Sequence, residues 1–104
     1  MRVEIVVLAS GSSGNAVLVR SGETSILVDA GISRLAIERR VAAAGHSAGE
    51  IAALLVTHEH SDHVAGIPVL LKRHPMPVWA TAGTWSRLDV RSPGGGELST
   101  GRAV

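Results

Sequence analysis

Short runs of aliphatic and β-branched residues, separated by glycine and serine, make up the N-terminal part of the chain. Val3–Ala9, Ala16–Arg20 and Ser25–Asp29 are three such runs, and the clusters SGSSGN and SGE lie between them. Runs of this length bounded by turn residues predict β-strands, and short separations predict hairpins. We therefore expect an antiparallel meander of three strands.

The period of the apolar residues then changes from strand-like to helical. Ile37 and Val41 lie four positions apart within the segment Arg34–Ala44, which is otherwise rich in charged residues and alanine. Ser33 is a suitable N-cap, and Gly45 is a suitable residue to end the helix. This segment is predicted to form an amphipathic helix.

Further along, strand and helix patterns alternate. Ala52–Thr57 is an uninterrupted apolar run that predicts a strand buried on both faces, Ile67–Arg73 predicts a helix, and Val78–Thr81 predicts another buried strand. Alternation of this kind is typical of an α/β fold. We expect one structural unit over residues 1–90 and a disordered Gly/Ser-rich tail over residues 91–104.

Composition restricts the chemistry. The chain has no cysteine, so a metal ion would be held by nitrogen and oxygen ligands. The formal net charge is +1, and the basic residues are scattered rather than clustered, which gives no electrostatic footprint for nucleic acid. No apolar run approaches the length of a membrane span, and we expect a cytoplasmic protein of undetermined oligomeric state.

The sequence THEHSDHVAG directly follows the apolar run that ends at Val56, and it holds three of the five histidines. Imidazole and carboxylate together suit Zn²⁺, Mn²⁺ or Fe²⁺. His58 and His60 can hold one ion, and Asp62 and His63 can hold a second ion beside it. The pattern is not H-E-x-x-H, so the glutamate between the first two histidines is not credited as a general base.

THEHSDHVAG resembles the metal-binding motif H-x-H-x-D-H of the metallo-β-lactamase-fold superfamily. The segments LASGSSGNAVLV, ILVDAGIS and PVWATAGTW also resemble the bacterial YycJ/WalJ branch, whose members are described as metal-dependent hydrolases and DNA exonucleases. The resemblance covers approximately residues 3–85. It implies a four-layer αβ/βα sandwich, of which this chain would supply the N-terminal half.

The resemblance also assigns roles to residues. His58 and His60 would bind the first divalent ion, and Asp62 and His63 would bind the second. Zn²⁺ is the first candidate for both ions, with Mn²⁺ or Fe²⁺ as alternatives. Asp29 would support the site from beneath by hydrogen bonding, although a strand-end aspartate can also cap a turn. The family completes its site with a histidine, an aspartate and a final histidine from the second half, and nothing after His63 supplies them.

Three functional hypotheses follow. The first is hydrolysis of phosphodiester bonds in DNA by a metal-bound hydroxide, with Asp62 as the catalytic residue that orients the nucleophile. The SGSSGN loop favours phosphate, because Ser12, Ser13 and Asn15 can contact it, although this loop also reads as a plain hairpin turn. The second is hydrolysis of a thioester, lactone or β-lactam. The third is a truncated, inactive fragment with an incomplete metal site and uncovered apolar faces.

Overall fold

The structure is a single mixed sheet with helices packed against it. It is a computed structural model that describes residues 2–58, 60–85 and 95–98, without the side chains of residues 61 and 62. The sheet order is β1-β2-β3-β4-β5-β6, antiparallel in the first two pairs and parallel in the rest. The elements are β1 (Val3–Ala9), β2 (Ala16–Ser21), β3 (Thr24–Val28), α1 (Arg34–Ala43), the 3₁₀ turn η1 (Ala48–Glu50), β4 (Ile51–Val56), α2 (Ser61–Val64), α3 (Ile67–Arg73), β5 (Val78–Thr81), α4 (Ala82–Trp85) and β6 (Gly95–Leu98).

The antiparallel meander is confirmed, because β1 pairs with β2 and β2 with β3 in antiparallel register. The helix expected after it is also confirmed. The Ser33 hydroxyl accepts a hydrogen bond from the backbone N–H of Ala36, and Gly45 follows the helix at φ +86°. A positive φ costs glycine little, because it has no Cβ. Local sequence therefore fixes both ends of α1.

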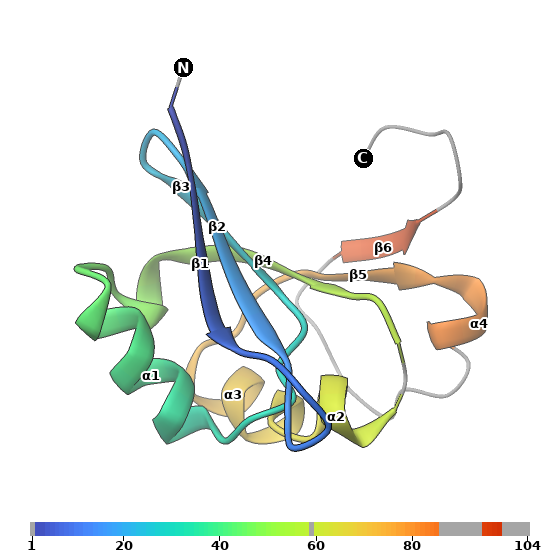
Figure 1. Ribbon diagram of the computed structural model, residues 1–104. Coiled ribbons are helices and arrows are strands. Elements are labelled where there is room, and N and C mark those ends of the chain that lie inside the picture. The colour runs from blue at the N-terminus through green and yellow to red at the C-terminus, as the bar shows by residue number, and fades with distance from the viewer. Residues whose placement is uncertain (1, 59, 86–94, 99–104) are drawn as a thin grey trace.

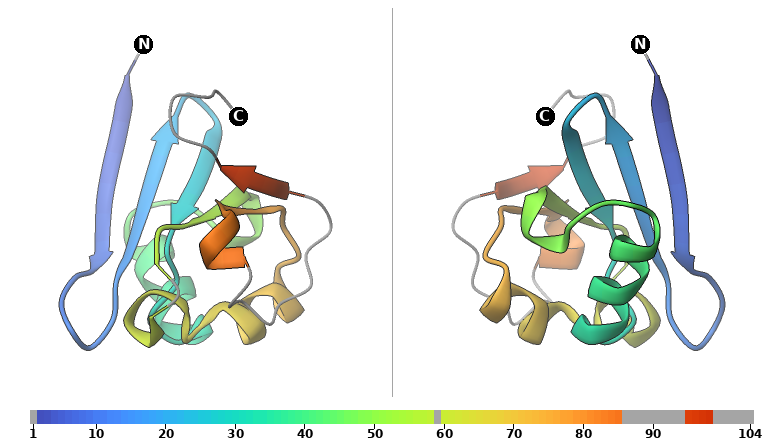
Figure 2. Two further views of the ribbon diagram at one scale, coloured as in Figure 1. Left: turned by 90° about the vertical axis from the view of Figure 1, so that its right-hand side faces the viewer. Right: turned by 90° about the vertical axis from the view of Figure 1, so that its left-hand side faces the viewer.

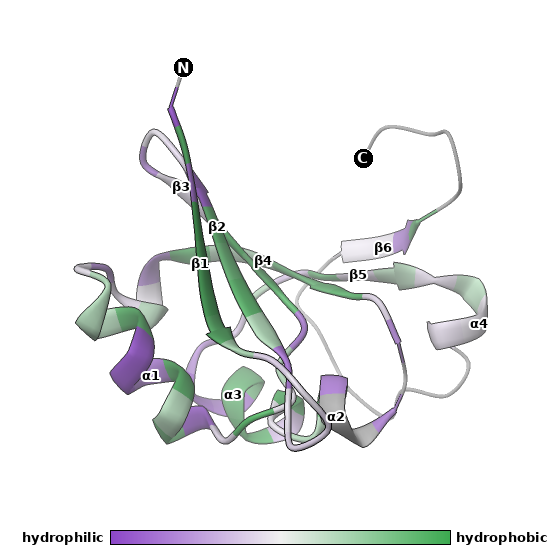
Figure 3. Cartoon of the chain, viewed as in Figure 1, coloured by the Kyte–Doolittle hydropathy of each residue, from purple (hydrophilic) through white to green (hydrophobic). Residues whose placement is uncertain are grey.

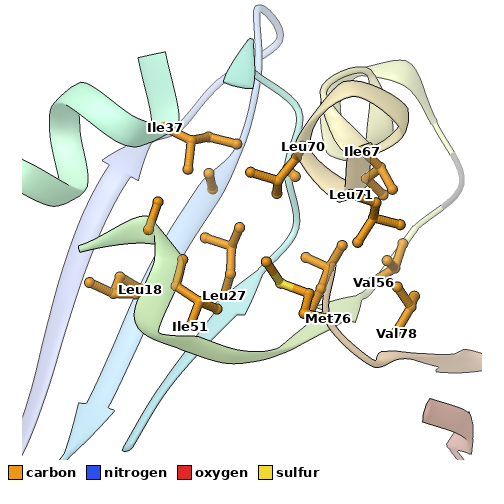
Figure 4. Close-up of a cluster of buried hydrophobic side chains, with 14 of the residues drawn as sticks. Leu18, Leu27, Ile37, Ile51, Val56, Ile67, Leu70, Leu71, Met76 and Val78 are labelled. Atoms are coloured by element: carbon orange, nitrogen blue, oxygen red, sulfur yellow. The ribbon is translucent and has the colours of Figure 1, made fainter. Parts of the chain in front are cut away.

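The helices α1, α2 and α3 gather on one side of the sheet (Figures 1 and 2). Beneath them, one row of directly paired residues crosses four strands: Leu18, Leu27, Leu54 and Val78. Each of these side chains is 0% exposed. Figure 4 shows Ile37 of α1 and Leu70 of α3 facing this row. The core is thus aliphatic and lies between the sheet and the helices.

The described residues leave part of the opposite face of the sheet uncovered. Strands β1 to β3 are hydrophobic along most of their length (Figure 3), yet Val3, Ile5 and Val7 of β1 are 56%, 66% and 62% exposed. On β4, Ala52 is exposed and Leu55 is half-buried. The expectation that β4 would be buried on both faces is therefore wrong for its described neighbours, because α1, α2 and α3 lie on one side of the sheet. The exposed apolar side chains of β1 agree with the expectation of uncovered apolar faces.

A second expectation also needs correction. The sequence from residue 91 on offered no element, but Gly95–Leu98 form β6, which pairs in parallel with β5. The indole N–H of Trp85 donates a 2.6 Å hydrogen bond to the carbonyl of Gly96. Backbone pairing to an open sheet edge, rather than side-chain pattern, places this strand. The other residues of the expected tail lie outside the described part of the chain.

No helix among the described residues is long and apolar enough to span a lipid bilayer.

Candidate metal centre

The histidines lie just beyond the carboxyl end of β4, the edge where α/β sheets commonly place their sites. His58 and His60 belong to the connection that leaves the strand, and His63 lies in α2. The backbone N–H of His63 donates to the carbonyl of His60, which turns this connection into the helix. The imidazole centroid of His58 lies 4.8 Å from that of His63 and 6.3 Å from that of His60. The fold therefore brings the three rings together.

Asp29 lies directly after β3, in contact with the His63 ring, and is 5% exposed. Its Oδ1 accepts a 2.8 Å hydrogen bond from the backbone N–H of Thr57. Its Oδ2 accepts a 2.6 Å bond from the Thr57 hydroxyl and lies 2.7 Å from Nδ1 of His63. This carboxylate therefore joins the end of β3 to the end of β4 and to α2. The alternative reading of Asp29 as the cap of a turn does not describe these contacts, which reach residues 28 and 34 positions further along the chain.

The backbone around Asp29 is fixed by further contacts. Asp29 has φ +63°, a conformation in which aspartate and asparagine are enriched among non-glycine residues. The N–H of Ala30 donates to the carbonyl of His63, and the N–H of Gly66 donates to the carbonyl of Ala30. A Cβ added at Gly66 would lie 1.9 Å from the carbonyl oxygen of Ile32. Glycine at position 66 is therefore required for α3 to begin against this loop.

The donor set can be compared with what a metal ion needs. A carboxylate only accepts, so the neutral His63 ring donates from Nδ1 to Asp29 and carries its lone pair on Nε2. Metal-binding histidines characteristically make such a bond through their second nitrogen. Within the described residues no group of three or more His, Asp or Glu side chains is arranged to hold an ion. The side chain of Asp62 lies outside the described part of the structure, so its predicted role remains a prediction.

The SGSSGN loop joins β1 to β2. The Asn15 side chain closes this loop, donating to the carbonyl of Gly11 at 2.8 Å and accepting from its N–H at 3.1 Å. The carbonyl of Asn15 accepts from the N–H of Gly31, which places the loop next to the Asp29 segment. Ser12 and Ser13 are exposed. A role in substrate binding remains a prediction for Ser12, Ser13 and Asn15.

Sequence reasoning missed Thr57. Its hydroxyl lies 2.6 Å from Asp29 Oδ2, 3.0 Å from His58 Nδ1 and 3.4 Å from His63 Nδ1. Threonine is common in strands, so no residue pattern singles it out. Its central position depends on Asp29, which lies 28 residues earlier in the chain.

Comparison with known proteins identifies the family. Residues 9–99 match the Metallo-beta-lactamase superfamily. The chain belongs to this superfamily. The exodeoxyribonuclease YycJ of Bacillus anthracis is 42% identical over 89 residues, which cover 86% of this chain and 34% of that protein. The exodeoxyribonuclease WalJ of Streptococcus pneumoniae (strain ATCC BAA-255 / R6) is 39% identical over 83 residues, covering 80% and 31%. The ribonuclease Z of Mycolicibacterium gilvum (strain PYR-GCK) is 37% identical over 99 residues, covering 79% and 34%.

Solved structures of metallo-β-lactamases share the fold. SMB-1, bound to 2-mercaptoethanesulfonate, superposes with a TM-score of 0.74 at 23% identity, covering 94% of this chain and 45% of that one. MEM-A1, a subclass B3 enzyme from a soil metagenome library, gives a TM-score of 0.68 at 28% identity, covering 86% and 34%. The chain spans about a third of the length of the curated relatives that it matches. The fold is therefore the N-terminal portion of the metallo-β-lactamase fold.

Proposed function

We propose that this chain carries part of the active site of a metal-dependent hydrolase that cleaves phosphodiester bonds in nucleic acid, with DNA as the first substrate to test. The observation that carries the proposal is the clustering of three imidazoles at the end of β4, one of which contacts a buried carboxylate. Support for the substrate comes from relatives of about 40% identity that are named as exodeoxyribonucleases, and from ribonuclease Z.

In this proposal His58 and His60 hold one divalent ion, and Asp62 and His63 hold the second. Zn²⁺ is the first candidate, with Mn²⁺ and Fe²⁺ as alternatives, because nitrogen and oxygen donors suit all three. When bound, such ions activate water and stabilise charge on the phosphoryl oxygens. Asp29 holds the His63 ring in place through the 2.7 Å contact at Nδ1.

A hollow on the helices carries basic side chains. Arg34 of α1 and Lys72 and Arg73 of α3 line this hollow of about 460 Å³, together with Val69. Arg34 is paired with Glu38 at 2.7 Å, so the net positive charge of the hollow comes from Lys72 and Arg73. In the proposed function this hollow contacts backbone phosphates of the nucleic acid, a contact that carries no sequence preference.

A second candidate is hydrolysis of a β-lactam or another ester-type substrate, and the likeness to MEM-A1 at 28% identity favours it. We rank phosphodiesters first, because the identity to the relatives named as nucleases is higher. A third reading is that this chain is inactive and holds ions weakly, through an incomplete set of ligands. The three readings differ in what they predict for metal affinity and for turnover.

The deciding experiment is a calorimetric titration of the metal-free chain with Zn²⁺ and with Mn²⁺, followed by assays of the loaded chain on linear DNA and on a chromogenic β-lactam. The matched control is the His58→Ala/His60→Ala double variant. Binding that the control lacks, together with release of nucleotides from DNA ends, supports the proposal. Turnover of the β-lactam alone favours the second reading. Equal, weak binding by both proteins favours the incomplete site.

A further inference from the structure

We propose that Thr57 is a positioning residue whose hydroxyl extends the hydrogen bonding of Asp29 to His58, so that one carboxylate sets the tautomers of two imidazoles. The inference rests on the proposed metal-binding role of the histidines and goes beyond it by assigning a residue outside the motif. It is carried by three distances around the Thr57 oxygen and by the burial of Asp29.

The hydroxyl of Thr57 has one proton to donate. At 2.6 Å, Oδ2 of Asp29 receives that proton in a hydrogen bond, because a carboxylate has none of its own to give. Toward any other partner the Thr57 oxygen is then an acceptor. Nδ1 of His58 lies 3.0 Å from this oxygen, so it must be the donor of that contact. Neutral His58 therefore carries its proton on Nδ1 and its lone pair on Nε2.

His63 reaches the same state by a shorter route, because its Nδ1 contacts Oδ2 of Asp29 directly at 2.7 Å. Its 3.4 Å separation from the Thr57 oxygen is longer, and the carboxylate is the stronger acceptor. Two rings from different elements thus present Nε2 lone pairs, one held directly by Asp29 and one through Thr57. A group that fixes ring orientation and tautomer in this way typically changes metal affinity by about 10–100-fold when it is removed.

A purely structural role for Thr57 is the competing explanation. The backbone N–H of Thr57 already donates to Oδ1 of Asp29 at 2.8 Å, so residue 57 could join the two strand ends without its hydroxyl mattering to His58. The two roles separate cleanly in substitutions. Thr57→Ser keeps the hydroxyl, whereas Thr57→Val keeps the shape and the backbone bond but loses the hydroxyl. Loss of the hydroxyl changes the stability of the chain whether Thr57 is structural or positions His58. It changes the tautomer of His58 only if Thr57 positions this ring.

The test is long-range ¹H–¹⁵N correlation of the histidine side chains in the metal-free chain at about pH 8, where an unperturbed imidazole is neutral. We expect both His58 and His63 with the proton on Nδ1 in the unaltered chain and in Thr57→Ser. In Thr57→Val we expect His58 to move toward the Nε2-protonated form while His63 stays unchanged as the internal control. Zn²⁺ affinity measured on the same samples should fall about 10–100-fold in Thr57→Val alone.

Two outcomes would overturn the proposal. One is an Nε2-protonated His58 in the unaltered chain, which needs no variant and so holds even if Thr57→Val does not fold. The other is a His58 tautomer that is the same in folded Thr57→Val as in the unaltered chain. Failure of the proposed metal-binding function has a different signature, since the unaltered chain would then bind no Zn²⁺ while the tautomer pattern persisted.

Discussion

The buried Asp29 carboxylate should be sensitive to the change of a single functional group, because it accepts hydrogen bonds from two distant residues. Replacing it with asparagine keeps the size of the side chain and tolerates the φ of +63°. An amide nitrogen, however, donates where a carboxylate oxygen accepts. In Asp29→Asn the nitrogen faces either the N–H of Thr57 or Nδ1 of His63, so one of these contacts must break or invert.

The size of the effect follows from those contacts. A hydrogen bond to a charged acceptor contributes about 1.5–3 kcal/mol. Asp29 is 5% exposed, but Thr57 is exposed and the His63 side chain is 20% exposed, so water recovers part of the loss. We expect Asp29→Asn to lower the free energy of unfolding by about 2 kcal/mol. Asp29→Ala should lower the free energy of unfolding by about 1 kcal/mol more, because the left-handed conformation is unfavourable for alanine.

Urea denaturation of the metal-free chain, followed by circular dichroism, measures this difference through the transition midpoint and slope. Glu23→Gln is the matched control, because it removes one carboxylate from the exposed turn between β2 and β3 and should change stability by less than about 0.5 kcal/mol. If Asp29→Asn unfolds within about 0.5 kcal/mol of the unaltered chain and binds Zn²⁺ equally well, the assigned role of this carboxylate is wrong.

Three further predictions test other parts of the structure. The 2.5 Å hydrogen bond from His74 lowers the pKa of Glu38 from its ordinary 4.5, so this carboxylate contributes stability above pH 4.5 that is lost as the pH falls through its lowered pKa. The difference in urea midpoint between the unaltered chain and Glu38→Gln should therefore narrow from pH 6 to pH 3. Gly66→Ala should destabilise the chain by about 2 kcal/mol or more, because its Cβ would lie 1.9 Å from the carbonyl oxygen of Ile32; an unchanged thermal midpoint would contradict this. The Ile5 side chain is 66% exposed on the open face, so Ile5→Thr should reduce binding of a hydrophobic dye. It should change the free energy of unfolding, measured with urea, by less than about 0.5 kcal/mol.

Local sequence predicted the elements whose shape depends on neighbours in the chain. The strand Val3–Ala9 and the helix Ile67–Arg73 have the boundaries expected from their apolar runs and flanking turn residues. Ser33 caps α1 because the hydroxyl of an N-cap serine is close to the backbone N–H three residues later wherever a helix begins. The clustering of the three histidines was also visible, since their spacing within one loop is a property of the sequence itself.

What the sequence by itself determined is therefore the strands β1 to β5, the helices α1 and α3 and the α/β class, and it predicts metal binding by THEHSDH. Only the tertiary structure decided which groups meet. Asp29 contacts Thr57 and His63 across 28 and 34 residues, and this depends on β3 and β4 lying in parallel register. The pairing of β6 with β5 and the open face of β1 arise in the same way. Hydrogen bonds and burial between distant segments depend on how the elements pack, and no local pattern contains that information.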